Sequence, residues 1–233
     1  MSGEGPPSGA GKDFVEPNLE RVQRLDAGMM WKNVLSTVCT RLLVLGTTSI
    51  IGLLTTREVI TTFGAEAYAQ YGLLATIPAL FPFLDLGIGA AVINIVAQSQ
   101  DREDYQPLML ALLASSRILL SSSAVTIVAV VGVGLSVGWP SLLGGILSRW
   151  DGNLIATACL VLFAFTIPFG LGQRILVGLR KNQLEIMILS LQAPLLLALV
   201  LLTGRLYPGF GLLVPLCFFV AAFIVNFVSL VIA

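Results

Sequence analysis

The residue with the clearest chemical potential is an arginine inside an apolar stretch. Arg41 lies in a run of mainly Leu, Val, Ile and Thr that extends over about residues 34–55. A charge near the bilayer centre costs about 2.5–3.5 kcal/mol on insertion scales, so it needs a compensating role or a route to water. At about 100° per residue, Thr37, Thr48 and Thr55 fall within about 40° of Arg41 on a helix. The predicted helix therefore has one polar stripe that carries a guanidinium group.

Two interpretations fit this stripe. In the first, Arg41, Thr37 and Thr48 border a water-filled cavity that attracts anions. In the second, the stripe is a small-residue packing face, and the Arg41 side chain extends to the cytoplasmic surface. Arg117, inside a later apolar run, has the same two interpretations: it joins Arg41 in one central cationic cavity, or it extends toward the cytoplasm.

A second unusual feature is the acid in the segment Pro78–Gly89. Two prolines and two glycines surround Asp85 there, which predicts a kinked helix with a weakened hydrogen-bond ladder. Asp85 could pair with Arg41, accept backbone hydrogen bonds at the break, or bind a proton or a sodium ion. Asn94 would face the opposite side of an unbroken helix, so Asp85 and Asn94 form one site only if the helix is kinked.

A third group is basic. Arg174, Arg180 and Lys181 lie close together after another apolar run. They are explained by anchoring on the cytoplasmic side, where positive residues accumulate. The alternative is a landing site for anionic phosphates at a cytoplasmic entrance.

Several kinds of chemistry are excluded or disfavoured. Histidine is absent, so no His-containing triad, zinc site or haem site can form. No phosphate-binding loop of the GxxxxGKS type is present, and a formal net charge of zero gives no basic field for nucleic acid. The three cysteines, Cys39, Cys159 and Cys217, lie far apart in apolar stretches and are predicted to be core residues. We expect no enzymatic activity, no metal and no cofactor.

The elements that must position these residues are membrane helices. The chain has 233 residues, of which 56% are hydrophobic and 11% charged, with mean hydropathy +0.92. A soluble domain usually carries about 25% charged residues. Six apolar runs reach or approach the roughly 20 residues that a spanning helix needs. They predict an all-α membrane protein, a six-transmembrane-helix bundle with spans over about 34–55, 71–97, 108–137, 154–178, 184–203 and 208–233. Residues 1–32 are predicted to form a cytoplasmic tail, with an interfacial helix or a solvated segment from Pro17.

The distribution of Lys and Arg predicts the orientation. With the N-terminus inside, the cytoplasmic segments hold seven of the basic residues and the outer joints hold Arg57, Arg149 and Arg205. This asymmetry favours a cytoplasmic N-terminus, and an even number of spans then places the C-terminus inside too. Because the last apolar run continues to Ala233 with no polar cap, we expect the chain to be part of a longer protein.

One stretch of about 60 residues carries a family resemblance. It contains Arg57, then Gly64-Ala65-Glu66-Ala67-Tyr68, then Asp85-Leu86-Gly87-Ile88-Gly89. These segments resemble the first hairpin of the polysaccharide (O-antigen type) flippases of the MOP superfamily, and the later joint 178–183 is similar to a lesser degree. The resemblance is to the N-terminal half of such a protein.

The resemblance implies one six-helix lobe of a two-lobed flippase that surrounds a cavity open alternately to either side. It implies a substrate of undecaprenyl-diphosphate-linked oligosaccharide, flipped across the bacterial cytoplasmic (inner) membrane for surface polysaccharide synthesis. A second six-helix lobe, either a C-terminal half or another copy, would be needed as partner. The alternative is a cation-coupled multidrug exporter of the same superfamily that uses Asp85.

Overall fold

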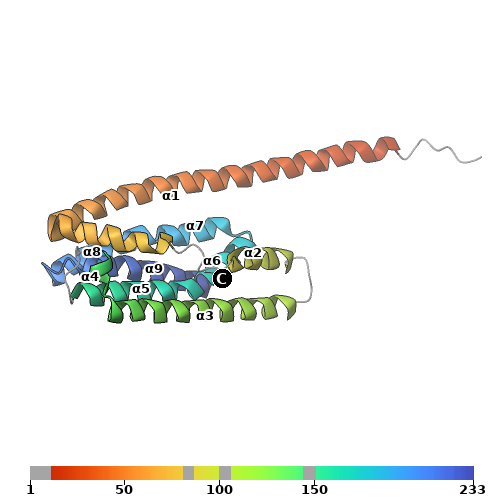
Figure 1. Cartoon of the computed structure of the whole chain (residues 1–233). Helices are drawn as coiled ribbons and strands as arrows, with labels where there is room; N and C mark the ends of the chain where they lie inside the picture. The colour runs from red at the N-terminus through yellow and green to blue at the C-terminus, as the bar shows by residue number, and fades with distance from the viewer. Residues whose placement is uncertain (1–11, 81–86, 100–105, 144–150) are drawn as a thin grey trace, which may run out of the picture. The chain divides into compact units, whose positions relative to one another are not determined.

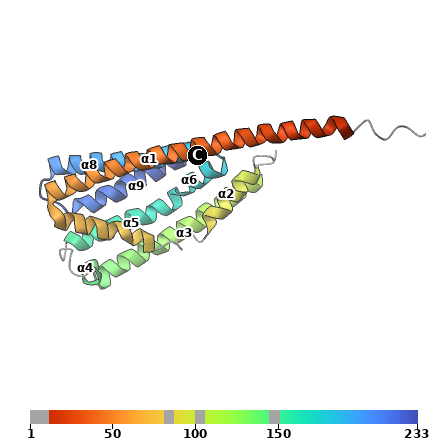
Figure 2. The ribbon, with the colours of Figure 1, turned by 90° about the horizontal axis from the view of Figure 1, so that it is seen from above.

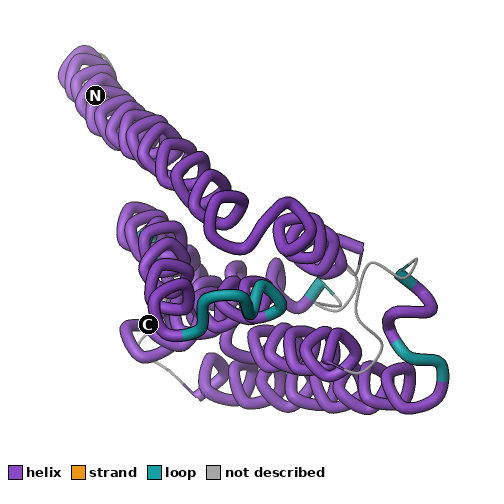
Figure 3. The backbone as a smooth tube through the Cα atoms, turned by 90° about the vertical axis from the view of Figure 1, so that its left-hand side faces the viewer, coloured by secondary structure: helices purple, strands orange, loops and turns teal. Residues whose placement is uncertain are grey.

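A computed structural model describes residues 12–80, 87–99, 106–143 and 151–233, and every regular element in these ranges is helical (Figure 1). Figure 3 shows the same helices from the left-hand end of Figure 1. In chain order the elements are α1 (Lys12–Thr76), the 3-10 helix η1 (Ile77–Leu80), α2 (Ile88–Ser99), α3 (Gln106–Ser136), α4 (Trp139–Leu142), α5 (Asp151–Phe169), α6 (Leu171–Gly178), α7 (Asn182–Ser190), α8 (Gln192–Leu206) and α9 (Leu213–Ile232).

Five helical segments are long and apolar enough to cross a membrane. Continuous or slightly interrupted helices supply them: Leu35–Thr76, Leu108–Ser136, Asp151–Gly178, Asn182–Leu206 and Leu213–Ile232. A shorter apolar helix covers Ile88–Ser99. The chain is therefore a helical, multi-pass membrane protein, as the composition predicted, while the count of six spans stays a prediction.

The predicted first two spans are arranged differently from expectation. Their predicted polar joint, residues 56–70, is helical and belongs to α1. The chain reverses at Gly64, whose φ of 90° lies in the left-handed region that suits glycine (Figure 1). The described parts of the predicted second span, 71–97, are the end of α1, η1 and α2, and residues 81–86 lie outside the described residues. A break in this span was expected from its prolines and glycines.

The chain divides into two compact units, Met1–Leu43 and Val44–Ala233. The described part of the first unit is helical from Lys12, earlier than the predicted helix start at Pro17. In the second unit, α1 is poorly covered at first: Leu45, Ile50 and Leu53 are exposed. Burial begins with Thr55 and Val59.

The core of the second unit is formed by α3, α5 and α9, which lie side by side (Figures 1 and 2). The helix α8 packs on α9, and α6 packs between α2 and α9. The buried apolar side chains are aliphatic residues, Phe219 and two cysteines, Cys159 and Cys217. The expectation of core cysteines is confirmed for these two and is wrong for Cys39, which is exposed.

The fourth predicted span is interrupted where its sequence indicated. Pro168 lies in the last turn of α5, and Gly170 separates α5 from α6 (Figure 2). Proline has no N–H, so the Ala164 carbonyl, four residues earlier, loses its helical donor. The hydroxyl of Ser123, on α3, donates a hydrogen bond of 2.7 Å to this carbonyl. A side chain 41 residues away thus satisfies the carbonyl that Pro168 leaves without a helical donor.

Beyond the break, α6 approaches α9 very closely. A Cβ added at Gly172 would collide with the backbone of Leu230, at its Cα and its nitrogen. Only glycine permits this approach, because the obstructing atoms are backbone and cannot rotate away. Close helix contact of this kind is how membrane helices gain packing energy in the absence of a hydrophobic force between them.

Candidate functional site

The proposed cationic stripe on α1 crosses the boundary between the two units. Arg41 is exposed and Thr37 is partly exposed, and both belong to the first unit. Thr48 belongs to the second unit, where its hydroxyl donates a 2.8 Å hydrogen bond to the Val44 carbonyl of the preceding turn. A threonine bonded in this way satisfies its own hydroxyl and remains compatible with an apolar or a hydrated environment. A water-filled cavity beside Arg41 stays a prediction.

Arg117 is exposed on α3, within a membrane-length helix. Its exposed neighbours Leu113, Leu120 and Ser121 are mostly apolar. Asn94 is exposed on α2, a helix that packs against α3. Asp85 lies outside the described residues, so its predicted pairing or ion binding stays a prediction. Since Arg41 and Arg117 belong to different units, a shared cavity between them stays a prediction as well.

The basic joint between α6 and α7 has a well-defined backbone. Lys181 N–H donates to the Leu176 carbonyl at 2.9 Å, and Arg180 N–H donates to the Val177 carbonyl at 3.0 Å. This pair of bonds is the Schellman motif, which ends helices with a left-handed residue that is usually glycine. Here that residue is Arg180, with φ 59°. The joint exposes two adjacent cationic side chains, those of Arg180 and Lys181.

Polar side chains inside the bundle pair with one another across helices. Gln173 Nε2 donates a 3.0 Å hydrogen bond to Asn226 Oδ1, which joins α6 to α9. No partner of Gln173 was predicted from the sequence. Ser229, also on α9, has a fully buried hydroxyl with no hydrogen-bond partner among the described residues.

A second polar cluster holds the far end of the α3–α5 hairpin. The Asn153 side chain donates 2.9 Å to the Gly134 carbonyl and accepts 2.9 Å from the Trp139 backbone N–H. The Trp139 indole donates 3.1 Å to Thr157 Oγ1. The Asn153 side chain therefore caps the end of α3 and fixes the start of α4. The Trp139 indole lies at the end of these helices, where an interfacial tryptophan is expected.

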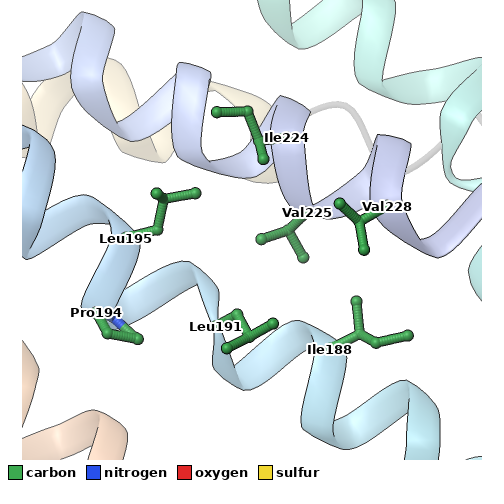
Figure 4. Close-up of a pocket in the computed structure, with 7 residues that line it drawn as sticks. All are labelled: Ile188, Leu191, Pro194, Leu195, Ile224, Val225 and Val228. Atoms are coloured by element: carbon green, nitrogen blue, oxygen red, sulfur yellow. The ribbon is translucent and has the colours of Figure 1, made fainter.

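A groove of about 330 Å³ opens between α7, α8 and α9 (Figure 4). The α7–α8 side chains and those of α9 face one another across it in Figure 4. The lining is wholly apolar: Ile188, Leu191, Pro194, Leu195, Ile224, Val225 and Val228. Leu191 forms the turn between α7 and α8, a break that the sequence analysis missed. Pro194, three residues later, was the signal that could have revealed it.

Within the described residues, no group of three or more Cys, Asp and Glu side chains is placed to hold a metal ion. No family model, curated protein or solved structure matches this chain. The arrangement therefore offers two kinds of contact. Exposed arginines on apolar helices can meet anions, and the apolar groove between α7, α8 and α9 can meet lipid.

Proposed function

We propose that this chain is one lobe of a transporter that flips a lipid-diphosphate-linked oligosaccharide across the bacterial cytoplasmic membrane for surface polysaccharide synthesis. The observation that carries the proposal is an arginine on each of two membrane-length apolar helices, Arg41 on α1 and Arg117 on α3, both exposed. The resemblance of the segments around Gly64 and Asp85 to the flippase hairpin supports the same class of substrate.

The depth of these arginines is what makes an anionic ligand a reasonable partner. Arg117 comes nine residues after Leu108, the first residue of its membrane-length segment, which places its Cα about 13 Å along the helix. The 29-residue segment is longer than the roughly 30 Å hydrocarbon core, and a segment centred in the membrane places Arg117 about 8 Å from the membrane centre. An unshielded diphosphate would be far costlier there than a guanidinium group. Inside a hydrated space enclosed by a second lobe, the diphosphate and the guanidinium group would therefore each lower the cost of burying the other.

The test is ligand binding by the purified chain in detergent, because binding by one lobe is measurable even where transport needs two. Undecaprenyl diphosphate is the probe. Arg41→Ala and Arg117→Ala should each weaken binding by about tenfold or more, corresponding to about 1.4 kcal/mol. Arg205→Ala is the matched control, since Arg205 is an exposed arginine in the last turn of α8.

Unchanged binding in both variants would overturn the proposal. A transport experiment tests the alternative, a cation-coupled exporter. The exporter is favoured if vesicles containing the chain accumulate a cationic dye under a sodium or proton gradient and Asp85→Asn abolishes the accumulation.

A further inference from the structure

The apolar groove between α7, α8 and α9 begins near one end of the bundle and extends to about its middle. Ile188 is about 9 Å and Leu195 about 20 Å along the helix from Asn182, at 1.5 Å per residue. On the neighbouring helix, Val228 is about 6 Å and Ile224 about 12 Å from the end at Ile232. Because α8 and α9 are antiparallel neighbours, both measurements start from the same end of the bundle. Measured from that end, the lining extends from about 6 Å to about 20 Å, so the groove covers most of the roughly 15 Å of hydrocarbon that one leaflet supplies and reaches about the middle of the membrane.

The volume of the groove fits one acyl chain. A methylene group occupies about the space of a water molecule, roughly 30 Å³ in liquid. The groove volume of about 330 Å³ therefore holds about eleven methylene groups. That is most of one phospholipid acyl chain and only a small part of a long polyprenyl chain. Since the lining is aliphatic throughout, water would gain no hydrogen bonds in it.

Two cations lie about 10 Å along the helix from Ile188, at the joint before α7, and they indicate which headgroup belongs there. Lys181, Leu184, Ile188 and Leu191 recur at intervals of three and four residues, so they follow one face of α7 from the joint to the groove. Lys181 and Leu184 are exposed, and Arg180 is exposed next to them. A lipid phosphate at this joint would meet two cations, each worth about 1 kcal/mol against an anionic headgroup.

We propose that the groove binds one acyl chain of an anionic phospholipid whose phosphate lies at Arg180 and Lys181. Neither Arg41 nor Arg117 lines the groove, so the two proposals rest on different residues. With a cytoplasmic N-terminus, the bound lipid belongs to the inner leaflet. A failure of the lipid-binding proposal can therefore be distinguished from a failure of the proposed transport function.

The experiment counts lipids retained on the purified full chain by native mass spectrometry, after incubation with mixed phosphatidylglycerol and phosphatidylcholine vesicles. The wild type should retain one phosphatidylglycerol. Ile224→Trp fills the groove from its exposed rim and should lower retention by about tenfold or more. Leu202→Trp is the matched control, because Leu202 is exposed on α8 but does not line the groove. Equal retention by wild type and Ile224→Trp would overturn the proposal.

The charge contribution is tested with Arg180→Gly combined with Lys181→Gln. Glycine adopts the left-handed conformation of position 180 more readily than arginine, so this variant removes charge without straining the joint. It should bind phosphatidylglycerol and phosphatidylcholine equally. A preference for phosphatidylglycerol that survives would contradict the assignment of the headgroup.

Two other occupants are distinguished directly. Leu191 replaced by the photocrosslinking residue benzoylphenylalanine should capture lipid in membranes; capture of a peptide from the first 43 residues would show that the first helix fills the groove instead. Undecaprenyl diphosphate at equal concentration should not displace phosphatidylglycerol. Displacement would assign the groove to the transported lipid and overturn the choice of a phospholipid.

Discussion

Two membrane-length helices of this protein are interrupted next to a proline, and their surroundings differ. At the α5–α6 break, Ser123 bonds the carbonyl that Pro168 leaves without a helical donor, and α9 packs within backbone contact of Gly172. At the α7–α8 break, Leu191 and Pro194 line an open apolar groove. We call these the sealed break and the open break.

The comparison shows that an interrupted membrane helix can be completed in two ways. Neighbouring helices supply the missing hydrogen bonds and contacts at the sealed break, as the hydrocarbon environment requires. At the open break, side chains instead surround a space that lipid can fill. We therefore expect the sealed break to tolerate little change and the open break to tolerate added volume.

The largest effect is expected at the close contact of the sealed break. Gly172→Ala places a methyl group against the Leu230 backbone, so α6 and α9 must separate. We expect a loss of about 3 kcal/mol, at the upper end of the usual overpacking range. Denaturant unfolding of the purified chain in micelles measures it. Gly132→Ala is the control, because an added Cβ there meets nothing within 4 Å; equal losses in both variants would show that the contact is unimportant.

The next effect concerns the donor to the Ala164 carbonyl. Ser123→Ala should destabilise the chain by about 1 kcal/mol, within the range measured for hydrogen bonds between membrane helices. In a Pro168→Ala background the helix regains its own N–H donor, and Ser123→Ala should then cost much less. A double-mutant cycle measures this coupling. Additive effects of the two substitutions would contradict the role given to Ser123.

A smaller effect is expected for the polar pair between α6 and α9. Asn226→Leu removes the acceptor for Gln173 and should cost about 0.6 kcal/mol, the average for such bonds in membranes. Asn94→Leu, at an exposed asparagine of α2, is the comparison. If Asn226→Leu lowers the unfolding midpoint no more than Asn94→Leu does, the hydrogen bond between Gln173 and Asn226 adds nothing to the stability of the α6–α9 contact.

The smallest effect belongs to the open break. Ile224→Trp adds volume at an exposed position on the groove rim, so we expect stability within about 0.5 kcal/mol of wild type. The same unfolding assay without added lipid measures it. A loss comparable to that of Gly172→Ala would mean that the groove is closed by protein and that the two breaks are alike.

Much of the fold was predictable from local sequence. The predicted span 108–137 agrees with α3, and the predicted joint 179–183 contains the turn between α6 and α7. Pro168 and Gly170 correctly indicated a broken fourth span. The segment 56–70 was predicted to be a joint between spans because it contains polar residues. It is helical, and the chain changes direction at a single residue, Gly64.

Less of the candidate site was predictable. Arg41 and Arg117 could be proposed from the sequence because a charge in an apolar run is conspicuous whatever its neighbours are, and their role stays a prediction. The groove was not found, since aliphatic residues such as Ile188 and Val225 have the same appearance in sequence whether they pack against protein or line a space.

The sequence by itself determined that this chain is helical and embedded in a membrane, because apolar runs of spanning length have no other stable arrangement in lipid. Only the tertiary structure decided which breaks are filled. The Ser123 bond to Ala164 and the contact of Gly172 with Leu230 join residues more than 40 positions apart. Such pairings follow from how whole helices approach one another, and periodicity within one helix carries no information about them.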